Sequence, residues 1–341
     1  MSRLLTLRVV STLLAILLAA CDKAPPAPPV AAPAASAAPA APVANESVKL
    51  RLAWVPDMAE VGVFVAKEMG YFEREKLDVT IEPGGFGLDP IKLVATGSSD
   101  YGVGRAGNLL LARAQGVPVV AVAAEFQDTP VGFVTRADSK ITSFKQFKGK
   151  RVGIQTGADT DVLYRALLVR NGMTSAAVRE VPIQYDMTPF LRGNIDVLPA
   201  YVTNQPVTLA AQGLKINVIT AQSEGLRYYG NVFFVTEARL KSHPEQVRRF
   251  VRALRSGWEH ALTNKADAIA ALQKYTKDFD PKDLDAIYDR VVPFIRGDGS
   301  SAEVLSMSDE RWLSTESVLR DAGLLKPGAA VGKAYTTDFL R

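Results

Sequence analysis

From residue 48 onward, apolar and polar positions follow two alternating periods along the chain. Short runs rich in Val, Ile and Leu are typical of strands, and between them lie stretches with the spacing of amphipathic helices. In the first part of the chain this pattern predicts strands over residues 48–54, 77–81, 101–104 and 117–124. It predicts helices over residues 60–67, 89–97 and 109–115, the second with Asp89 as N-cap before Pro90.

The pattern then repeats with a second set of elements, followed by a helical region. Strands are predicted over residues 151–154, 180–183, 195–200 and 216–220, and helices over 161–170 and 188–191. A last strand at 231–236 precedes helices predicted over 246–262, 266–275, 282–291 and 309–322. Ser242 and Glu245 have the spacing of a capping box, which predicts that the longest helix begins there.

Strands that alternate with helices predict an α/β fold with mostly parallel sheets, covered by helices on both faces. Two such sets predict two α/β lobes joined by a hinge, with the second lobe inserted in the first. The predicted boundaries are 48–132 for the first part of lobe 1, 133–230 for lobe 2, and 231–341 for the return to lobe 1. We expect the chain to cross between the lobes at 129–135 and 229–235. Ligands of open α/β sheets bind beyond the carboxyl ends of the strands, so binding residues are expected in those loops.

The first 21 residues carry the pattern of an export signal. Arg3 and Arg8 accompany an apolar run at residues 9–18, which is shorter than a membrane span and typical of a signal peptide. Leu18-Ala19-Ala20-Cys21 resembles a bacterial lipobox, which predicts a lipoprotein signal over 1–21 and lipidation of Cys21. The alternative is a plain secretory signal whose cysteine is incidental.

Residues 22–47 are nearly all Ala and Pro and show no apolar periodicity, which predicts an extended tether. A lipid anchor followed by a tether predicts an extracytoplasmic protein held at a membrane. In a cell with two membranes, Asp22 after the cysteine resembles the signal for retention at the inner membrane, on its periplasmic face.

Composition narrows the function further. The 341 residues carry 40 Lys and Arg against 36 Asp and Glu, a formal net charge of +4, with no basic stripe for nucleic acid. One cysteine and two histidines exclude a Cys-rich metal site and leave little room for a His-based centre. The usual hydrolase, zinc-protease and phosphate-loop motifs are absent from the sequence. We therefore expect no catalytic residues, no cofactor and no metal. We also expect the protein to be a monomer.

Gly102, Gly104 and Gly107 match the G-x-G-x-x-G fingerprint of dinucleotide-binding folds, and Glu125 lies downstream as a candidate ribose-binding acid. The motif follows the third predicted strand instead of opening the fold, and Arg105 occupies the phosphate turn. We therefore interpret it as a backbone loop that closely approaches another ligand, with Gly104, Arg105 and Asn108 as binding candidates.

Aromatic and amide side chains gather at predicted strand ends and crossovers. The candidate binding residues of this group are Trp54, Asp57, Tyr201, Asn204, Tyr229 and Asn231. Aromatic rings can stack on a flat heteroaromatic molecule while Asn and Asp hydrogen-bond to its edge. The alternative is that some of these rings pack at the hinge, which we favour for Tyr228.

Several specific motifs are spread over residues 48–341. They include Trp54-Val55-Pro56-Asp57, Gly70-Tyr71-Phe72, Leu93-Val94-Ala95-Thr96-Gly97, Asp100-Tyr101-Gly102-Val103-Gly104, Phe147-Lys148-Gly149-Lys150-Arg151-Val152-Gly153 and Tyr335-Thr336-Thr337-Asp338-Phe339-Leu340. Together they resemble the SsuA/THI5-like (NMT1) family, the substrate-binding proteins of importers for thiamine precursors, riboflavin and alkanesulfonates. This resemblance implies the type II periplasmic-binding-protein fold, with an ABC permease and its ATPase as partners.

The resemblance also frames the choice of ligand. One relative of this fold is an enzyme that makes the thiamine pyrimidine from its own histidine. The matching position here looks to be Glu60, which we take as a candidate binding residue, and the cysteine cluster of that enzyme is absent. Tyr201 to Pro206 look like the branch for pyrimidine and riboflavin uptake. We expect a solute receptor that prefers a thiamine-related pyrimidine, with riboflavin second and an alkanesulfonate such as taurine as the alternative. Closure should bring Thr156, Asp159, Tyr201 and Asn204 across the cleft.

Overall fold

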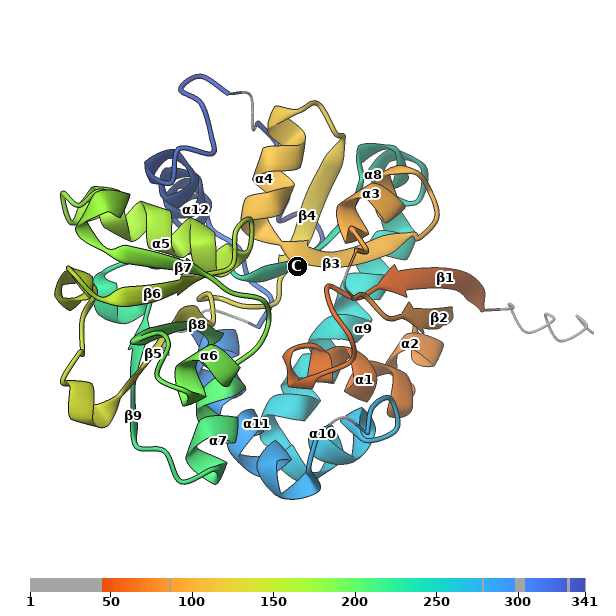
Figure 1. The fold of residues 1–341 in the computed structure, drawn as a ribbon. Helices are drawn as coiled ribbons and strands as arrows, with labels where there is room; N and C mark the ends of the chain where they lie inside the picture. Colours follow the sequence, from red (N-terminus) through yellow and green to blue (C-terminus); the bar gives the residue numbers. More distant parts are fainter. Residues whose placement is uncertain (1–44, 86, 278, 298–303, 330–331, 341) are drawn as a thin grey trace, which may run out of the picture. The chain divides into compact units, whose positions relative to one another are not determined.

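The computed structural model describes residues 45–85, 87–277, 279–297, 304–329 and 332–340. The predicted signal peptide, Cys21 and nearly all of the predicted tether lie outside these residues. Residues 43–341 form one compact unit (Figure 1). Among the described residues, no helix is long and apolar enough to cross a membrane.

The first sheet has five strands in the order β2-β1-β3-β10-β4. Their bounds are Glu46–Arg51 (β1), Leu77–Glu82 (β2), Tyr101–Arg105 (β3), Val119–Ala124 (β4) and Asn231–Thr236 (β10). The helices between them are Val61–Glu68 (α1), Tyr71–Arg74 (α2), Pro90–Ala95 (α3) and Ala106–Ala114 (α4). The first strand starts two residues earlier than predicted because Glu46 pairs with Leu77 at the start of β2.

The second sheet has the order β7-β6-β8-β5-β9. Its strands are Val131–Arg136 (β5), Arg151–Ile154 (β6), Arg179–Pro182 (β7), Val197–Tyr201 (β8) and Ile216–Thr220 (β9). Its helices are Asp159–Arg170 (α5), Thr188–Leu191 (α6) and Gln205–Ala211 (α7). Short 3-10 turns lie at Met58–Glu60, Ala137–Ser139, Phe144–Phe147, Ser175–Ala177 and Gln222–Glu224.

Each sheet is mixed, with one antiparallel strand among parallel ones. The strand β10 runs antiparallel to β3 and β4, and β5 runs antiparallel to β8 and β9. Both strands directly follow the passage of the chain from the other sheet, so they enter their sheet from the opposite end. Residues 131–135, predicted as part of a crossover, belong to β5.

The two segments that connect the sheets run side by side. The backbone N–H groups of Glu125 and Phe126 donate to the carbonyl of Asn231 at 2.9 and 3.1 Å, and Thr129 N–H donates to Tyr228 O at 3.0 Å. Short connections between two lobes are the places where hinge motions of proteins occur.

The rest of the chain is helical. The helices are Glu237–Ser242 (α8), Pro244–Thr263 (α9), Lys265–Leu272 (α10), Pro281–Arg296 (α11) and Asp309–Asp321 (α12). The predicted capping box at Ser242 is wrong, because Ser242 ends α8 and its hydroxyl bonds Ala238 O and the ring of His243. His243 is the N-cap of α9, and Pro244 occupies the first turn, where a missing N–H costs nothing.

Helix α9 packs closely against α1 on the first sheet. A Cβ added at Gly62 would lie 2.2 Å from the ring of Trp258, and one at Gly257 would lie 2.4 Å from the carbonyl of Gly62. Trp258 is fully buried at this contact. The two glycines therefore fix how close the helices approach and seat the loop between β1 and α1, which carries part of the site described below.

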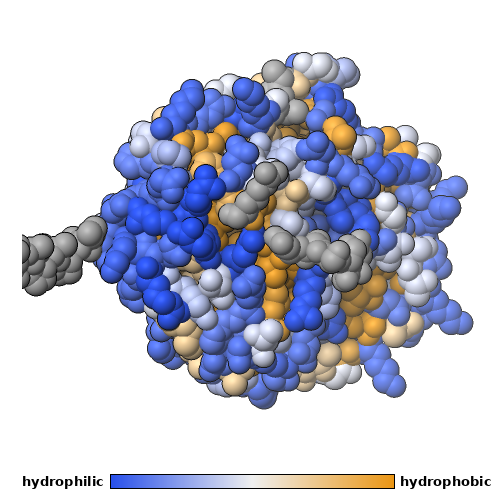
Figure 2. Space-filling model, turned by 180° about the vertical axis from the view of Figure 1, so that it is seen from behind, coloured by the Kyte–Doolittle hydropathy of each residue, from blue (hydrophilic) through white to orange (hydrophobic). Residues whose placement is uncertain are grey.

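Figure 2 shows the molecule from behind, where hydrophilic residues cover most of the face and hydrophobic ones reach the surface in patches between them. Exposed aromatic rings have a different distribution. Of the described Phe, Trp and Tyr residues, only Trp54 and Tyr185 are exposed, with 36% and 61% of their surface accessible. Both lie at the cleft between the two sheets.

Candidate ligand-binding cleft

A cavity of about 340 Å³ lies between the loops at the carboxyl ends of the two sheets. The loop after β1 contributes Trp54, Asp57 and Glu60, and the end of β3 contributes Arg105. The second sheet contributes further lining residues, which are Tyr185, Tyr201, Thr203, Asn204 and Gln205. Its volume and its mixture of aromatic and polar side chains are typical of a small-molecule site.

A second cavity of about 440 Å³ adjoins the first. The two share Ala53, Trp54, Arg105 and Tyr185 as lining residues, so these four stand between them. A ligand with a ring in the first cavity could therefore extend a side chain past Arg105 into the second.

The two exposed rings at the cleft face each other from different sheets. Trp54 follows β1 and Tyr185 follows β7, and their ring centroids are 6.0 Å apart with planes tilted by 38°. This spacing suits a direct aromatic contact. Exposed aromatic surface at a cavity is a feature of binding sites.

A three-residue cluster, which we call the cross-sheet latch, joins the sheets beside the cavity. It consists of Arg105 at the end of β3, Asp159 at the start of α5, and Tyr201 at the end of β8. Arg105 forms an ion pair with Asp159, and its Nε donates to the Tyr201 hydroxyl at 3.1 Å. The Tyr201 hydroxyl in turn donates to Asp159 Oδ2 at 3.0 Å.

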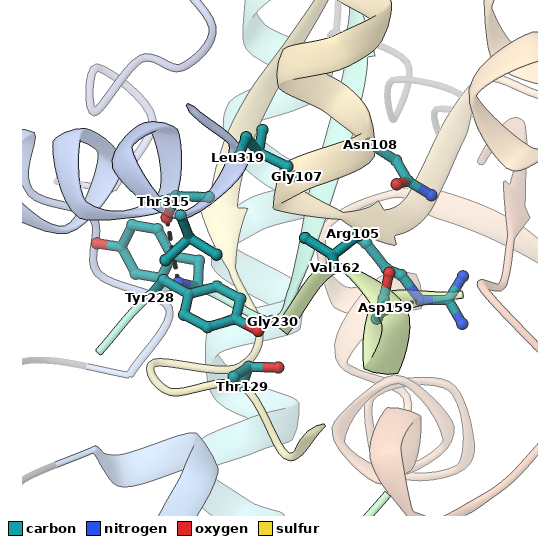
Figure 3. Close-up of a pocket in the computed structure, with 12 residues that line it drawn as sticks. Arg105, Gly107, Asn108, Thr129, Asp159, Val162, Tyr228, Gly230, Thr315 and Leu319 are labelled. Carbon is teal, nitrogen blue, oxygen red and sulfur yellow. Dashed lines mark hydrogen bonds and ion pairs between the residues drawn. The ribbon is translucent and has the colours of Figure 1, made fainter. Parts of the chain in front are cut away.

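Charge and burial reinforce the latch. The Asp159 carboxylate raises the pKa of Arg105, and burial raises that of Tyr201, so the guanidinium and the neutral hydroxyl persist at ordinary pH. Figure 3 shows Arg105 and Asp159 beside a small cavity of about 30 Å³, with Tyr228 and Thr129 on its other side. The latch thus separates this narrow space from the two larger cavities.

Three carboxyl groups lie close together at the inner part of the cleft. Asp57 is the N-cap of the Met58–Glu60 turn and accepts from Ala59 N–H at 2.6 Å. Burial raises the pKa of Asp57, and it raises the pKa values of Glu60 and Glu125 well above their usual range. Neighbouring carboxyls add to the effect, since Asp57 and Glu125 both raise the pKa of Glu60.

Comparison with known protein families identifies the family of this chain. The family model described as NMT1/THI5 like matches residues 58–268, more than half of the chain. The chain belongs to the NMT1/THI5-like family. The family resemblance expected from the sequence motifs is therefore confirmed.

Two relatives of this chain are named as binding proteins. The riboflavin-binding protein RibY of Chloroflexus aurantiacus is 29% identical over 99% of this chain and 97% of its own length. The formylaminopyrimidine-binding protein of Halalkalibacterium halodurans is 25% identical over 78% of each chain. A third relative, from Legionella pneumophila, is named a 4-amino-5-hydroxymethyl-2-methylpyrimidine phosphate synthase and is 22% identical over 86% of this chain and 92% of its own.

Solved structures identify the fold. The periplasmic aliphatic sulphonate binding protein SsuA of Escherichia coli superimposes with a TM-score of 0.68 at 13% identity, covering 85% of this chain and 92% of that one. The family member described here therefore has the expected periplasmic-binding-protein fold.

Seven of the twelve binding residues expected from the sequence line the cavity. These are Trp54, Asp57, Glu60, Arg105, Tyr201, Asn204 and Asn231. Asp159 takes part through the latch, and Gly104 and Asn108 line the adjoining cavity. A Cβ at Gly104 would lie 3.0 Å from the Phe234 ring, so close strand packing already accounts for that glycine.

The other two expected residues lie elsewhere. Thr156 is exposed in the loop after β6 and is not among the residues that line the cavity. Tyr229 is buried at the connection between the sheets, where its hydroxyl accepts from Ser308 N–H at 2.8 Å and its ring contacts Trp312. That Thr156 and Tyr229 contact the ligand remains a prediction, and their positions in the structure do not support it.

The glycine motif is explained by packing. Gly102 and Gly104 lie within β3 against Phe234, and Gly107 faces Leu319 of α12. A dinucleotide fingerprint needs its glycines in the turn between strand and helix. The arrangement agrees with our rejection of a dinucleotide site.

Sequence reasoning missed Tyr185 and Glu125 as members of the cleft. Tyr185 follows the predicted strand 180–183, so the strand-end rule that selected Trp54 and Tyr201 also applied to it. Glu125 was considered only as a ribose-binding acid. Its electrostatic influence on Glu60 acts between distant parts of the chain, and no local pattern encodes it.

Proposed function

We propose that this protein is an extracytoplasmic solute receptor of an ABC importer, which captures a small heteroaromatic nutrient and delivers it to the permease. The cavity between the two sheets carries this proposal, because both sheets supply its walls and its two exposed rings. A flat ring that packs in the cavity against Trp54 and Tyr185 would gain contacts from both sheets at once.

Two ring compounds are the candidate ligands. A thiamine-related pyrimidine is the preferred one, and the formylaminopyrimidine-binding relative supports it. Riboflavin is the close second, supported by the similarity to RibY along almost the whole chain. The adjoining cavity beyond Arg105 offers space for the longer side chain that riboflavin carries.

A sulfonate fits less well. Anions favour free N–H groups at a helix N-terminus. At the start of α5, however, Gly157 N–H donates to the Asp161 carboxylate at 3.1 Å, and Asp159 pairs with Arg105. The protein's own carboxylates thus occupy the positions that a sulfonate would need.

A synthase is the competing class, because several relatives carry that name. We propose that this chain is not an enzyme. Where the family enzyme type has its reactive histidine, this chain has Glu60.

The geometry suggests how binding proceeds. The ligand first docks on the first sheet through Trp54, and rotation at the paired connection then brings the second sheet over it. The latch between Arg105, Asp159 and Tyr201 forms only when the sheets approach, so it stabilises the closed form. Contacts made only in that form offset the lost mobility of the sheets.

The N-terminal region completes the proposal. Lipidation at Cys21 would hold the protein at the outer face of the cytoplasmic membrane, and the tether over residues 22–47 would let the receptor reach the permease. We propose that it acts there as a monomer.

Calorimetric titration tests the proposal. Wild-type protein is titrated with 4-amino-5-hydroxymethyl-2-methylpyrimidine, riboflavin and taurine. Stacking of a ring on an aromatic side chain contributes about 1–3 kcal/mol, so Trp54→Ala should weaken the better ring ligand roughly tenfold or more, at about 1.4 kcal/mol per tenfold. Tyr201→Phe should cost less than Tyr201→Ala, because it keeps the ring.

Trp312→Phe is the matched control, because Trp312 is buried against Tyr229 and Tyr335 away from the cavity. Its affinity for the ring ligand should equal that of the wild type. Tight binding of taurine with no response to either ring compound would place the protein with the sulfonate receptors. Unchanged affinity in a folded Trp54→Ala variant would overturn the aromatic contact.

A further inference from the structure

Glu60 is a buried acid at the cavity wall, and one of its carboxyl oxygens has no hydrogen-bond partner among the described residues. Its side chain is only 1% exposed, it lines the 340 Å³ cavity, and its Oε2 has no hydrogen-bond partner among the described residues. A buried acceptor left without a partner destabilises the protein, because it has lost its hydrogen bonds to water. Such a group at a cavity wall is satisfied most simply by a ligand.

The Glu60 carboxyl lies near that of Asp57, close enough for each to shift the other's pKa. Two carboxyl groups can share a hydrogen bond only when one of them carries a proton. Asp57 already accepts a hydrogen bond from Ala59 N–H at 2.6 Å. Asp57 is thus the better place for the negative charge, and Glu60 is the better place for the proton.

We propose that Asp57 and Glu60 share one proton and that Glu60 Oε2 accepts a hydrogen bond from an N–H group on the edge of a neutral heteroaromatic ring. This proposal rests on the proposed function and deepens it, because it states which edge of the ring enters the cleft. An exocyclic amino group of a pyrimidine and the ring N–H of a flavin both supply such a donor. An edge that presents only acceptors leaves Oε2 unpaired and is rejected.

The electrostatics agree with this assignment. Burial, together with the charges of Asp57 and Glu125, raises the pKa of Glu60 well above its usual range, which favours its protonated form. Arg105 also lines the cavity, but Asp159 engages its guanidinium, so it is not the counter-charge of Glu60. A neutral acid that accepts through its carbonyl oxygen suits a neutral donor better than it suits a cation.

Matched ligand pairs test the proposal by titration. The pairs are riboflavin with 3-methylriboflavin, and 4-amino-5-hydroxymethyl-2-methylpyrimidine with its 4-dimethylamino analogue; each methylation removes the N–H donor and keeps the ring. Wild-type protein should bind the better parent compound at least about tenfold more tightly than its methylated partner. The pair that shows this preference also identifies which source of the N–H group is used.

Variants of Glu60 distinguish recognition of a hydrogen-bond acceptor from recognition of a negative charge. Glu60→Gln presents a carbonyl oxygen to the ligand and an N–H to Asp57, so it should keep the parent affinity within about threefold. Glu60→Leu should bind the parent at least about tenfold more weakly and should no longer distinguish parent from methylated ligand. Glu237→Gln is the control, because Glu237 pairs with Arg113 and is not among the cavity-lining residues; it should keep the preference for the parent.

The outcomes are separable from those of the proposed function. If neither parent ring binds the wild type, the proposed function is wrong. If a parent binds but its methylated partner binds equally well, the function stands and the role of Glu60 is overturned. Equal losses in Glu60→Gln and Glu60→Leu would overturn the shared proton, since a charge and not an acceptor would then be recognised. The preference measured on wild-type protein holds even if Glu60→Leu fails to fold.

Discussion

At the scale of single residues, the chemistry of the cleft depends on side chains that the sequence partly identifies. Trp54 and Tyr201 could be selected because aromatic residues at the ends of strands tend to face the cleft of an α/β fold. Thr156 could not be excluded, because it also follows a predicted strand; in the structure it is exposed, and the next residue, Gly157, donates its N–H to Asp161. The surroundings of Glu60 come from Glu125 and Asp57, which meet only in the folded chain.

Substitution of Glu60 should change how stability depends on pH. A carboxyl whose pKa is raised on folding keeps its proton in the folded protein while the unfolded chain releases it. Wild-type stability is therefore lost as the pH rises from the ordinary Glu pKa of 4.5 through the raised value. Glu60→Gln does not titrate at this position, so its stability relative to wild type should increase between pH 5 and pH 8, by up to about 1.4 kcal/mol per pH unit.

Urea unfolding of both proteins at pH 5, 6.5 and 8 measures this difference. Glu46→Gln is the control, because hydrogen bonds from Arg249 and Gln246 lower the pKa of Glu46. A lowered pKa affects stability only below the ordinary value, so the effect of this substitution should stay constant from pH 5 to pH 8. A constant difference for Glu60→Gln over the same range would show that Glu60 is ionised in the folded protein.

At the scale of elements, the sequence predicts where strands and helices lie better than how they are directed. The strand at 231–236 was predicted with its observed bounds, yet the hydrophobic pattern of a strand is the same in both directions. Its antiparallel pairing follows from the passage of the chain between the sheets. The apolar run of β5 was predicted as part of a crossover because almost all of it is buried, which removes the alternation that marks a strand.

The latch gives a prediction at this scale. Asp159→Asn keeps the size of the side chain but weakens its bonds to Arg105 and Tyr201, so the closed form should be less populated and the ligand should bind about three- to tenfold more weakly. Asp196→Asn is the matched control, since Asp196 pairs with Arg151 within the second sheet. Titration should show wild-type affinity for Asp196→Asn. Equal affinities for wild type and Asp159→Asn would show that the latch does not contribute to closure.

At the scale of the whole molecule, the two-sheet architecture was predictable from the repeated strand and helix pattern, and similarity to solved structures confirms the fold. The closeness of the two sheets at the latch was not predictable in detail, because it depends on one arginine reaching two partners in the other sheet. The lipid anchor is predicted from the sequence alone, and an experiment on cells is needed to test it.

Cys21→Ser should release the protein from membranes without changing its thermal unfolding, because Cys21 lies outside the compact unit of residues 43–341. Fractionation of cells that produce either protein measures the membrane-bound share, and attachment through more than one acyl chain predicts a nearly complete shift to the soluble fraction. Serine at residue 36 offers a control, since Ser36→Ala lies in the tether and should leave attachment unchanged. If Cys21→Ser remains with the membranes like the wild type, the lipid anchor is wrong.

The central claim is that the cleft between the two sheets holds a nitrogen-containing heteroaromatic ring. Native mass spectrometry of the purified protein, incubated with equal amounts of 4-amino-5-hydroxymethyl-2-methylpyrimidine, riboflavin and taurine, tests it most directly. We predict a one-to-one complex with one of the two ring compounds, strongly reduced in Trp54→Ala. A complex with taurine alone, or no complex with any of the three compounds, would contradict the account.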